Sequence, residues 1–326
     1  MNRFGTQFRL TLWGESHGPQ IGVTIDGVPA GTALAEADFE SDLARRRSSG
    51  TGGATPRREK DEPQIVSGTY RGYTTGAPLT IVFANGDTHP EEYAALAGHD
   101  RPSHADRVAW ERSGGHNDPR GGGHFSGRLT LALVAAGTVA KKLLPATVRF
   151  ATQIVGIGGC TDPDRFDEIL RAAAADGDSV GATVECRVGG IPAGWGEPFF
   201  DTVESLAAHL LFAIPGVKGV EFGSGFAAAR MRGSEHNDPI LDAAGRTATN
   251  HAGGIVGGLT NGNELVVRAA FKPTASIARE QTTYNRTTGR QEPLVIGGRH
   301  DTCIALRGAA AVEAAVAITL ADLRRP

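Results

Sequence analysis

Residues 7–26, QFRLTLWGESHGPQIGVTID, decide the fold of the first part of the chain. Apolar and polar residues alternate on both sides of residues 14–18, which is the period of a half-buried strand. The stretch therefore predicts a β-loop-β unit with Ser16 and His17 at its tip. Residues 14–18 also match the G-x-S-x-G pattern of a serine hydrolase, but in that pattern a strand leads through the serine into a helix. Because both flanks predict strands, we reject the hydrolase interpretation.

A short repeat suggests how the rest of the chain is organised. The pentapeptide GVPAG at residues 27–31 recurs as GIPAG at residues 190–194, an offset of 163 residues in a chain of 326. Each copy follows an alternating strand pattern and precedes a helical one. We therefore predict a single domain over residues 1–326 with an internal pseudo-two-fold repeat, roughly 1–163 and 164–326.

Strands and helices are predicted in alternating groups along the chain. Alternation predicts strands around residues 79–83 and 265–271, and helical spacing predicts helices over 129–144, over 162–177 and through 312–320. The strands come in hairpin-like groups between the helices. This order favours an α+β fold over a doubly wound parallel sheet.

One short segment resembles a dinucleotide-binding motif but lacks the helix that should follow it. Gly223–Ala228 approximates G-x-G-x-x-A after a short strand pattern. Arg230 and Arg232 interrupt the apolar helix that a βαβ unit would require there. We therefore expect no nicotinamide-dinucleotide site at this position.

Composition limits the classes of protein that this chain can belong to. The net charge of −3 gives no global field that would favour nucleic acid. The three cysteines have no CxxC spacing, which argues against a disulfide framework or a zinc site and for a reducing compartment. The ten histidines show no HxxxH or HExxH spacing, so we predict no metal. Residues 1–11 lack the apolar run of a signal peptide, and no apolar run is long enough to span a membrane. We expect a cytoplasmic protein.

Five clusters combine basic or hydroxyl side chains with glycine, and they lie at residues 14–18, 45–58, 101–128, 250–276 and 299–301. Arginine offers a planar fork that matches carboxylate and phosphate, and glycine lets the backbone approach a ligand closely. A histidine beside glycines is a candidate general acid or base. The clusters therefore predict a site for an anionic small molecule. Compensation of a helix dipole at Arg45–Arg47, and ordinary surface loops elsewhere, remain the alternative explanations.

Taken together, these clusters resemble the chorismate synthase family from Phe4 to about Leu323. Ten motifs in one order carry the resemblance: GESHG (14–18), DGVPAG (26–31), LARRR (43–47), RPSHAD (101–106), RGGGHFSGR (120–128), GIPAG (190–194), VKGVEFG (217–223), NHAGGIVGG (250–258), FKPTASI (271–277) and GRHDTC (298–303).

The resemblance implies a lyase that catalyses anti-1,4-elimination of phosphate from 5-enolpyruvylshikimate 3-phosphate to give chorismate, the last step of the shikimate pathway. It implies a requirement for reduced FMN without net redox change. Whether the chain reduces its own flavin with NADPH stays open. The implied fold is a β-α-β sandwich with helices between two antiparallel sheets, and the implied assembly is a homotetramer, a dimer of dimers.

The resemblance also implies roles for particular residues. His17 resembles the histidine that gives a proton to the departing phosphate, and His104 the one that stabilises the anionic reduced flavin. Asp301 resembles the carboxylate near flavin N5 that helps to move the proton lost from the substrate. The implied substrate contacts are Ser16, Arg46, Arg101, Arg128 and Arg299. The implied FMN contacts are Ser126, Gly127, Arg128, Asn250, Lys272 and Ser276.

The chain departs from the family pattern at several positions. His124 stands where many relatives have an arginine, and Gly52 aligns with another common arginine that Arg57 could replace. Thr302 replaces a frequent proline, and the segment over 145–162 is shorter than usual. These positions leave individual anion contacts open.

Two other functions stay open as alternatives. An FMN-dependent flavoprotein reductase would bind FMN but leave the phosphorylated substrate unchanged, and it would need a nicotinamide site. A nucleic-acid-binding protein would need a basic face and would show steep salt dependence.

Overall fold

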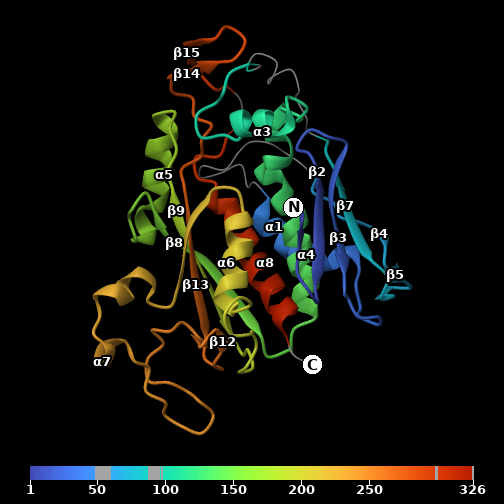
Figure 1. The fold of residues 1–326 in the computed structure, drawn as a ribbon, viewed down its shortest axis with the longest axis vertical. Coiled ribbons are helices and arrows are strands. Elements are labelled where there is room, and N and C mark those ends of the chain that lie inside the picture. Colours follow the sequence, from blue (N-terminus) through green and yellow to red (C-terminus); the bar gives the residue numbers. More distant parts are fainter. Residues whose placement is uncertain (48–59, 87–95, 97, 298–299, 325–326) are drawn as a thin grey trace.

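Two antiparallel sheets enclose a layer of helices in the computed structural model (Figure 1). The structure describes residues 1–47, 60–86, 96, 98–297 and 300–324. The predicted α+β sandwich is confirmed. Each copy of the GVPAG-type pentapeptide lies between a strand and a helix, but an internal repeat of the whole domain stays a prediction.

The first sheet contains the β-loop-β unit predicted from residues 7–26. Its strands, in spatial order, are β1 (Arg3–Phe4), β2 (Arg9–Gly14), β3 (Gln20–Asp26), β7 (Leu79–Ala84) and β4 (Gln64–Ser67). Strands β2 and β3 pair antiparallel with Leu12 opposite Val23, so Ser16 and His17 occupy the connection between them. The strand–turn–strand path confirms that these residues do not form a hydrolase elbow.

The second sheet is built around two central strands, and one of them is largely buried. Its strands, in spatial order, are β10 (Val217–Phe222), β13 (Leu265–Phe271), β9 (Ala182–Gly189) and β8 (Arg149–Ile157). The strand predicted around residues 265–271 is confirmed as β13, and its alternate residues Leu265, Val267, Ala269 and Phe271 are buried. Strand β10 pairs antiparallel with β13 and leads into a 3-10 turn, so the G-x-G-x-x-A motif opens no βαβ unit, as predicted.

Four helices fill the space between the sheets. They are α1 (Glu40–Arg46), α4 (Thr130–Lys142), α6 (Val203–Ala213) and α8 (Ala305–Leu323). Helix α8 lies at the centre and packs against the other three helices and against β8 and β9. Helices α4 and α8 cross very closely, since a Cβ atom on Gly137 would lie 2.4 Å from Cβ of Ala314.

Buried charge also fixes the helices to one another. Glu313 of α8 is 3% exposed and accepts from Arg45 of α1 at 2.7 Å and from Lys141 of α4 at 2.6 Å. Burial alone would raise the pKa of Glu313, but hydrogen bonds and ion pairs with these two cations outweigh it and lower the pKa to about 2. The carboxylate therefore links three helices.

A second buried carboxylate joins the two ends of the chain. Asp322, near the end of α8, accepts hydrogen bonds from the backbone N–H groups of Gln7 at 2.6 Å and Phe8 at 2.8 Å. A third bond comes from the N–H of Thr6 at 2.8 Å. The last turn of the central helix therefore holds the start of the first sheet in place.

The remaining elements lie around this core. The other helices of the described residues are α3 (Asp106–Ser113), α5 (Phe166–Ala175) and α7 (Gly233–His236). The short hairpins are β5 (Thr69–Tyr70) with β6 (Tyr73–Thr74), β11 (Ile255–Val256) with β12 (Leu259–Thr260), and β14 (Gln281–Asn285) with β15 (Arg290–Leu294). The 3-10 segments are Glu36–Phe39, Arg120–Phe125, Gly127–Leu129, Pro163–Arg165 and Gly225–Arg230.

The helices predicted over 129–144, over 162–177 and through 312–320 are confirmed as α4, α5 and α8. Within the described ranges, no helix combines the length and the apolar character needed to cross a membrane.

Candidate active site

A cavity of about 630 Å³ lies where segments from distant parts of the chain meet. This volume is in the range of small-molecule sites. Most of the predicted site residues line it: Ser16, Arg46, Arg101, His104, Ser126, Gly127, Arg128, Lys272, Ser276 and Asp301. The first copy of the pentapeptide is not involved, and the cavity is formed by the ends of α1, β13 and α8 together with the loops around residues 101–106 and 120–128.

The glycine-rich segment brings His17 against the cavity wall. Gly121 has a φ of 57°, and a Cβ atom there would lie 2.3 Å from Nδ1 of His17 and 3.0 Å from Oγ of Ser16. Only glycine permits this approach. Any side chain would collide with His17, and residues with a side chain seldom adopt the left-handed backbone of Gly121. The N–H of Ser16 also donates to the carbonyl of Gly123 at 3.1 Å. The Ser16–His17 connection and the glycine segment therefore form one unit.

His104 is held between two loops of the cavity wall. Its Nδ1 lies 3.0 Å from the carbonyl oxygen of Pro102, and its Nε2 lies 2.8 Å from Oγ of Ser276. Burial, assisted by Arg101, lowers the pKa of His104 to about 4. A neutral ring must donate from Nδ1 to the carbonyl, so Nε2 accepts from the hydroxyl of Ser276.

Lys272 ties the end of β13 to the same loop. Its Nζ donates to the carbonyl of Ser103 at 2.8 Å, and burial lowers its pKa. Lys272, Ser276 and His104 therefore form one polar wall of the cavity.

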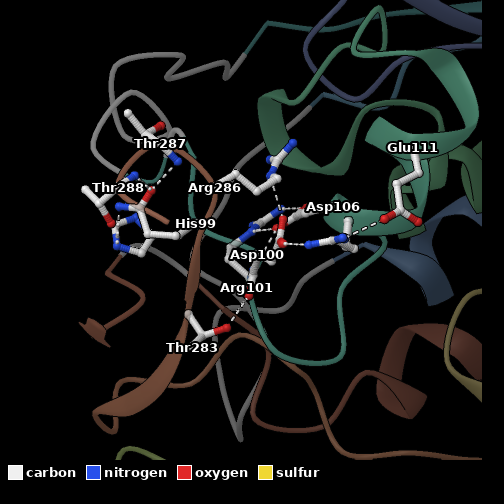
Figure 2. Close-up of polar contacts among 11 residues, drawn as sticks. His99, Asp100, Arg101, Asp106, Glu111, Thr283, Arg286, Thr287 and Thr288 are labelled. Carbon is white, nitrogen blue, oxygen red and sulfur yellow. Dashed lines mark hydrogen bonds and ion pairs between the residues drawn. The ribbon is translucent and has the colours of Figure 1, made fainter. Parts of the chain in front are cut away.

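Arg101 is fixed by a carboxylate on α3, as Figure 2 shows. Its Nε lies 2.7 Å from Oδ2 of Asp106, and its Nη2 lies 2.8 Å from Oδ1. The neighbouring Asp100 lies 2.7 Å from Nε of Arg286, and the hydroxyl of Thr283 donates to its carbonyl. The hairpin β14–β15 thus anchors the loop that carries Arg101 and His104.

Two further arginines lie almost fully buried beneath the cavity. Arg46 is 1% exposed, and its Nε donates to Oγ1 of Thr130 at 3.0 Å. Arg128 is 5% exposed, and its Nε donates to Oδ1 of Asn85 at 3.1 Å. Burial, followed by the nearby Arg307, moves the pKa of Arg46 well below its usual range. These groups give the cavity a strongly positive floor.

Some buried guanidinium nitrogens have no hydrogen-bond partner within the described parts of the chain: Arg46 Nη1, Arg128 Nη2 and Arg307 Nε. Buried donors without acceptors are costly, and an anionic ligand would supply the acceptors. The donor set therefore fits a phosphorylated or carboxylated ligand. FMN has a phosphate and fits the same chemistry.

Sequence reasoning missed two residues of this site. Arg307, on the first turn of α8, lies 3.2 Å from Oδ2 of Asp301, and Asp61 pairs with Arg46 and Arg128. Arg307 lies four residues after the GRHDTC motif, at the start of the final predicted helix. This position close to the motif could have identified Arg307 as a site residue. Asp61 sits in the charged run REKDE, which has no distinguishing pattern.

One predicted residue that the structure describes, Asn250, lies away from the cavity. The side chain of Asn250 donates to the carbonyl of Glu264 at 2.8 Å and accepts from the N–H of Gly254 at 2.9 Å. These contacts lie before the start of β13, whereas the cavity lies at the end of that strand. Arg299 lies outside the described residues, as do Gly52 and Arg57.

Two positions that depart from the family pattern make contacts that the structure describes. His124 lines the cavity, and its Nδ1 lies 2.7 Å from the carbonyl of Gly14, so it joins the glycine segment to the end of β2. The carbonyl of Thr302 accepts from the N–H of Val180 at 2.9 Å. Among the described side chains, no three of His, Cys, Asp or Glu are grouped as a metal site would require, and the lack of a metal stays a prediction.

This chain is similar to known proteins over almost its whole length. The family model for chorismate synthase matches residues 8–324. A chorismate synthase of Chitinophaga pinensis is 55% identical over 322 residues, covering 99% of this chain and 96% of the relative. One from Korarchaeum cryptofilum is 42% identical, covering 98% of this chain and 96% of the relative. A crystal structure of chorismate synthase superimposes with a TM-score of 0.74 at 25% identity, covering 98% of this chain and 92% of that one. The match over almost the whole chain shows that it belongs to the chorismate synthase family and is therefore a lyase.

Proposed function

We propose that the chain catalyses anti-1,4-elimination of phosphate from 5-enolpyruvylshikimate 3-phosphate to give chorismate, and that it requires reduced FMN in the same cavity. Membership of the family supports the assignment to the final step of the shikimate pathway. The observation that carries the reaction is the cavity itself, which combines buried arginines with His104, Asp301 and the adjacent His17.

The charges of the substrate match the floor of the cavity. The substrate carries one phosphate and two carboxylates, and Arg46, Arg128 and Arg307 offer charge-assisted donors to such groups. During elimination the C–O bond breaks and its electron pair leaves with the phosphate, while a proton leaves the ring. Positive groups near the phosphate stabilise the charge that develops on it in the transition state.

His17 is proposed to give a proton to the departing phosphate. Its imidazole packs against Gly121, whose segment forms part of the cavity wall, and Ser16 lies beside it. Asp301, held by Arg307 at 3.2 Å, is proposed to help move the proton that the substrate loses. Both assignments use groups whose ordinary role in catalysis is proton transfer.

The polar wall formed by Lys272, Ser276 and His104 is proposed to receive the reduced flavin, together with Ser126 and Gly127. When bound, the reduced flavin would supply electrons transiently, because the reaction has no net redox change. His104 is neutral in the ligand-free cavity, with its pKa near 4. An adjacent anion would raise this pKa and allow the ring to become a cationic donor.

We further propose a homotetramer that brings Asn250 to the cavity of a neighbouring subunit. Several large apolar side chains are exposed on and near the segment that extends away from the sandwich beside α7 (Figure 1): Phe226, Ile240, Leu241 and Val256. Exposed apolar surface of this kind is typical of protein interfaces. Asn250 lies on the same segment. An assembly that covers this segment would bring Asn250 close to the proposed FMN site of a neighbouring subunit. A cytoplasmic location stays a prediction.

The test is phosphate release from 5-enolpyruvylshikimate 3-phosphate under anaerobic conditions, with and without chemically reduced FMN. Release that depends on reduced FMN, with chorismate formed in equal amount, is the expected result. FMN binding without phosphate release would contradict the proposal and favour the flavoprotein reductase instead. NADPH added in place of the chemical reductant would reveal whether the chain reduces its own flavin.

A further inference from the structure

The two buried arginines beneath the cavity share a counter-ion. Asp61 is 5% exposed, and its Oδ1 accepts a hydrogen bond from Nη1 of Arg128. Its Oδ2 lies 3.7 Å from Nη1 of Arg46. One carboxylate thus bridges two guanidinium groups that line the cavity. Asp61 itself lies behind them and does not line the cavity.

The backbone of Asp61 adopts a conformation that favours this placement of the carboxylate. Its φ is 50°, in the left-handed region that residues with a side chain seldom adopt. Aspartate tolerates the region better than most residues, and such conformations persist where surrounding contacts impose them. The ion pairs with Arg46 and Arg128 are contacts of this kind.

The arginine pair keeps unused hydrogen-bonding capacity in spite of Asp61. Within the described chain, Nη1 of Arg46 and Nη2 of Arg128 are buried and have no hydrogen-bond partner. In addition to burial, the positive charge of Arg307 lowers the pKa of Arg46, and Arg307 itself pairs with Asp301. Asp61 therefore compensates one of the two charges in the pair and leaves donors for a further anion.

We propose that Asp61 is a resident counter-ion that determines the anion selectivity of the Arg46–Arg128 pair. Its carboxylate occupies one anion position, so a small anion gains little by binding. A ligand with several anionic groups gains contacts elsewhere in the cavity and binds in spite of Asp61. This inference rests on the proposed function, in which inorganic phosphate is a product that must leave the cavity.

The test measures small-anion binding to the flavin-free protein by calorimetry, with inorganic phosphate and formate as the probes. Asp61→Asn keeps the shape of the side chain without its charge, and Asp61→Gly suits the left-handed backbone. We expect both variants to bind both anions about tenfold more tightly or better, because a negative charge a few ångströms away no longer repels them. The matched control is Asp26→Asn, which removes a carboxylate paired with Arg9 on the surface and should change neither affinity.

Unchanged or weaker anion affinity in the folded variants would overturn the proposal. If a variant unfolds in anion-free buffer, its melting temperature is measured with added phosphate. Recovery of folding supports the counter-ion role, whereas failure of phosphate to restore either variant shows a purely structural role and contradicts it. The readout needs no turnover. Tighter anion binding in the variants, combined with no phosphate release from the substrate by the parent, would therefore reject the proposed function but keep Asp61 as the counter-ion of the arginine pair.

Discussion

At the scale of single residues, the site depends on where glycine permits close contact. Gly121 lies against both His17 and Ser16, and no other residue type could occupy its position without displacing them. The neighbouring Gly122 and Gly123 also have positive φ, so the whole segment follows a path reserved for glycine. The chemistry of His17 therefore depends on residues that have no side chain.

His17→Gln is expected to lower the rate of chorismate formation by about 10²–10⁴-fold, the usual contribution of a general acid. Glutamine has a similar size, so the melting temperature should change little. The matched control is His116→Gln, at an exposed position in the loop after α3. A His17→Gln rate within tenfold of the parent would exclude proton donation by His17.

His104 should make the ligand-free protein sensitive to acid. Its pKa is lowered from 6.5 to about 4 on folding, so the unfolded chain binds a proton first as the pH falls. The contribution to stability is complete above about pH 6.5 and is lost toward pH 4, by about 3 kcal/mol at most. Urea unfolding of the parent and of His104→Asn at several pH values checks this. Parallel curves for the two proteins would show that another group is responsible.

At the scale of elements, the helix layer is held by close crossings rather than by large side chains. Helix α4 approaches α8 where Gly137 faces Ala314, and this contact sets how closely the two helices can pack. Glycine inside a helix normally lowers stability. Its presence at position 137 indicates that close packing of the two helices matters more here than intrinsic helix propensity.

Gly137→Ala therefore tests which effect is larger. Alanine is favoured by about 1 kcal/mol in a helix, whereas overpacking a tight core costs about 1–3 kcal/mol. With a Cβ–Cβ distance of 2.4 Å, we expect overpacking to dominate and the free energy of unfolding to fall. Adding Ala314→Gly should recover part of the loss, a non-additive effect that denaturant unfolding can measure. Stabilisation by Gly137→Ala alone would mean that the helices can separate without cost.

At the scale of the whole molecule, the segment beside α7 exposes large apolar side chains, which is the surface on which the proposed homotetramer rests. Phe226 is 81% exposed and Ile240 is 73% exposed, on a segment that Figure 1 shows projecting from the sandwich. A partner surface would remove this area from water, which is the usual driving force of association.

The double variant Ile240→Glu/Leu241→Glu is expected to disperse the proposed homotetramer, because it places charges in an interface that excludes water. Light scattering on the parent and the variant gives the assembly state directly. The control is Phe200→Glu, an equally exposed apolar position on another loop. If the parent is a monomer, or if the variant assembles like the parent, this segment is not the interface.

Local alternation predicted an α+β fold, and the resemblance to the family, which rests on short continuous motifs, implied the sandwich and most of the cavity residues. The alternation around residues 14–18 requires a hairpin, and the motifs that contain His104, Arg128 and Lys272 are continuous in sequence. Asp61 was missed because its partners are distant in the chain, and a carboxylate in a charged run resembles a solvated one until its burial is known. The contact predicted for Asn250 is absent from the cavity of the single chain, and under the proposed assembly it would come from a neighbouring subunit, which sequence alone does not locate.

The hydrogen bonds that Asp322 accepts have a consequence for how the protein is made. They join residues separated by 314 to 316 positions, so the first strand reaches its final anchor only after nearly all of the chain exists. Contacts of such long range close late and slow folding. During synthesis the amino-terminal hairpin lacks these hydrogen bonds until the final helix has left the ribosome. Synthesis that stops before Asp322 would release chains whose first sheet lacks this anchor, and these chains would be substrates for chaperones and proteases.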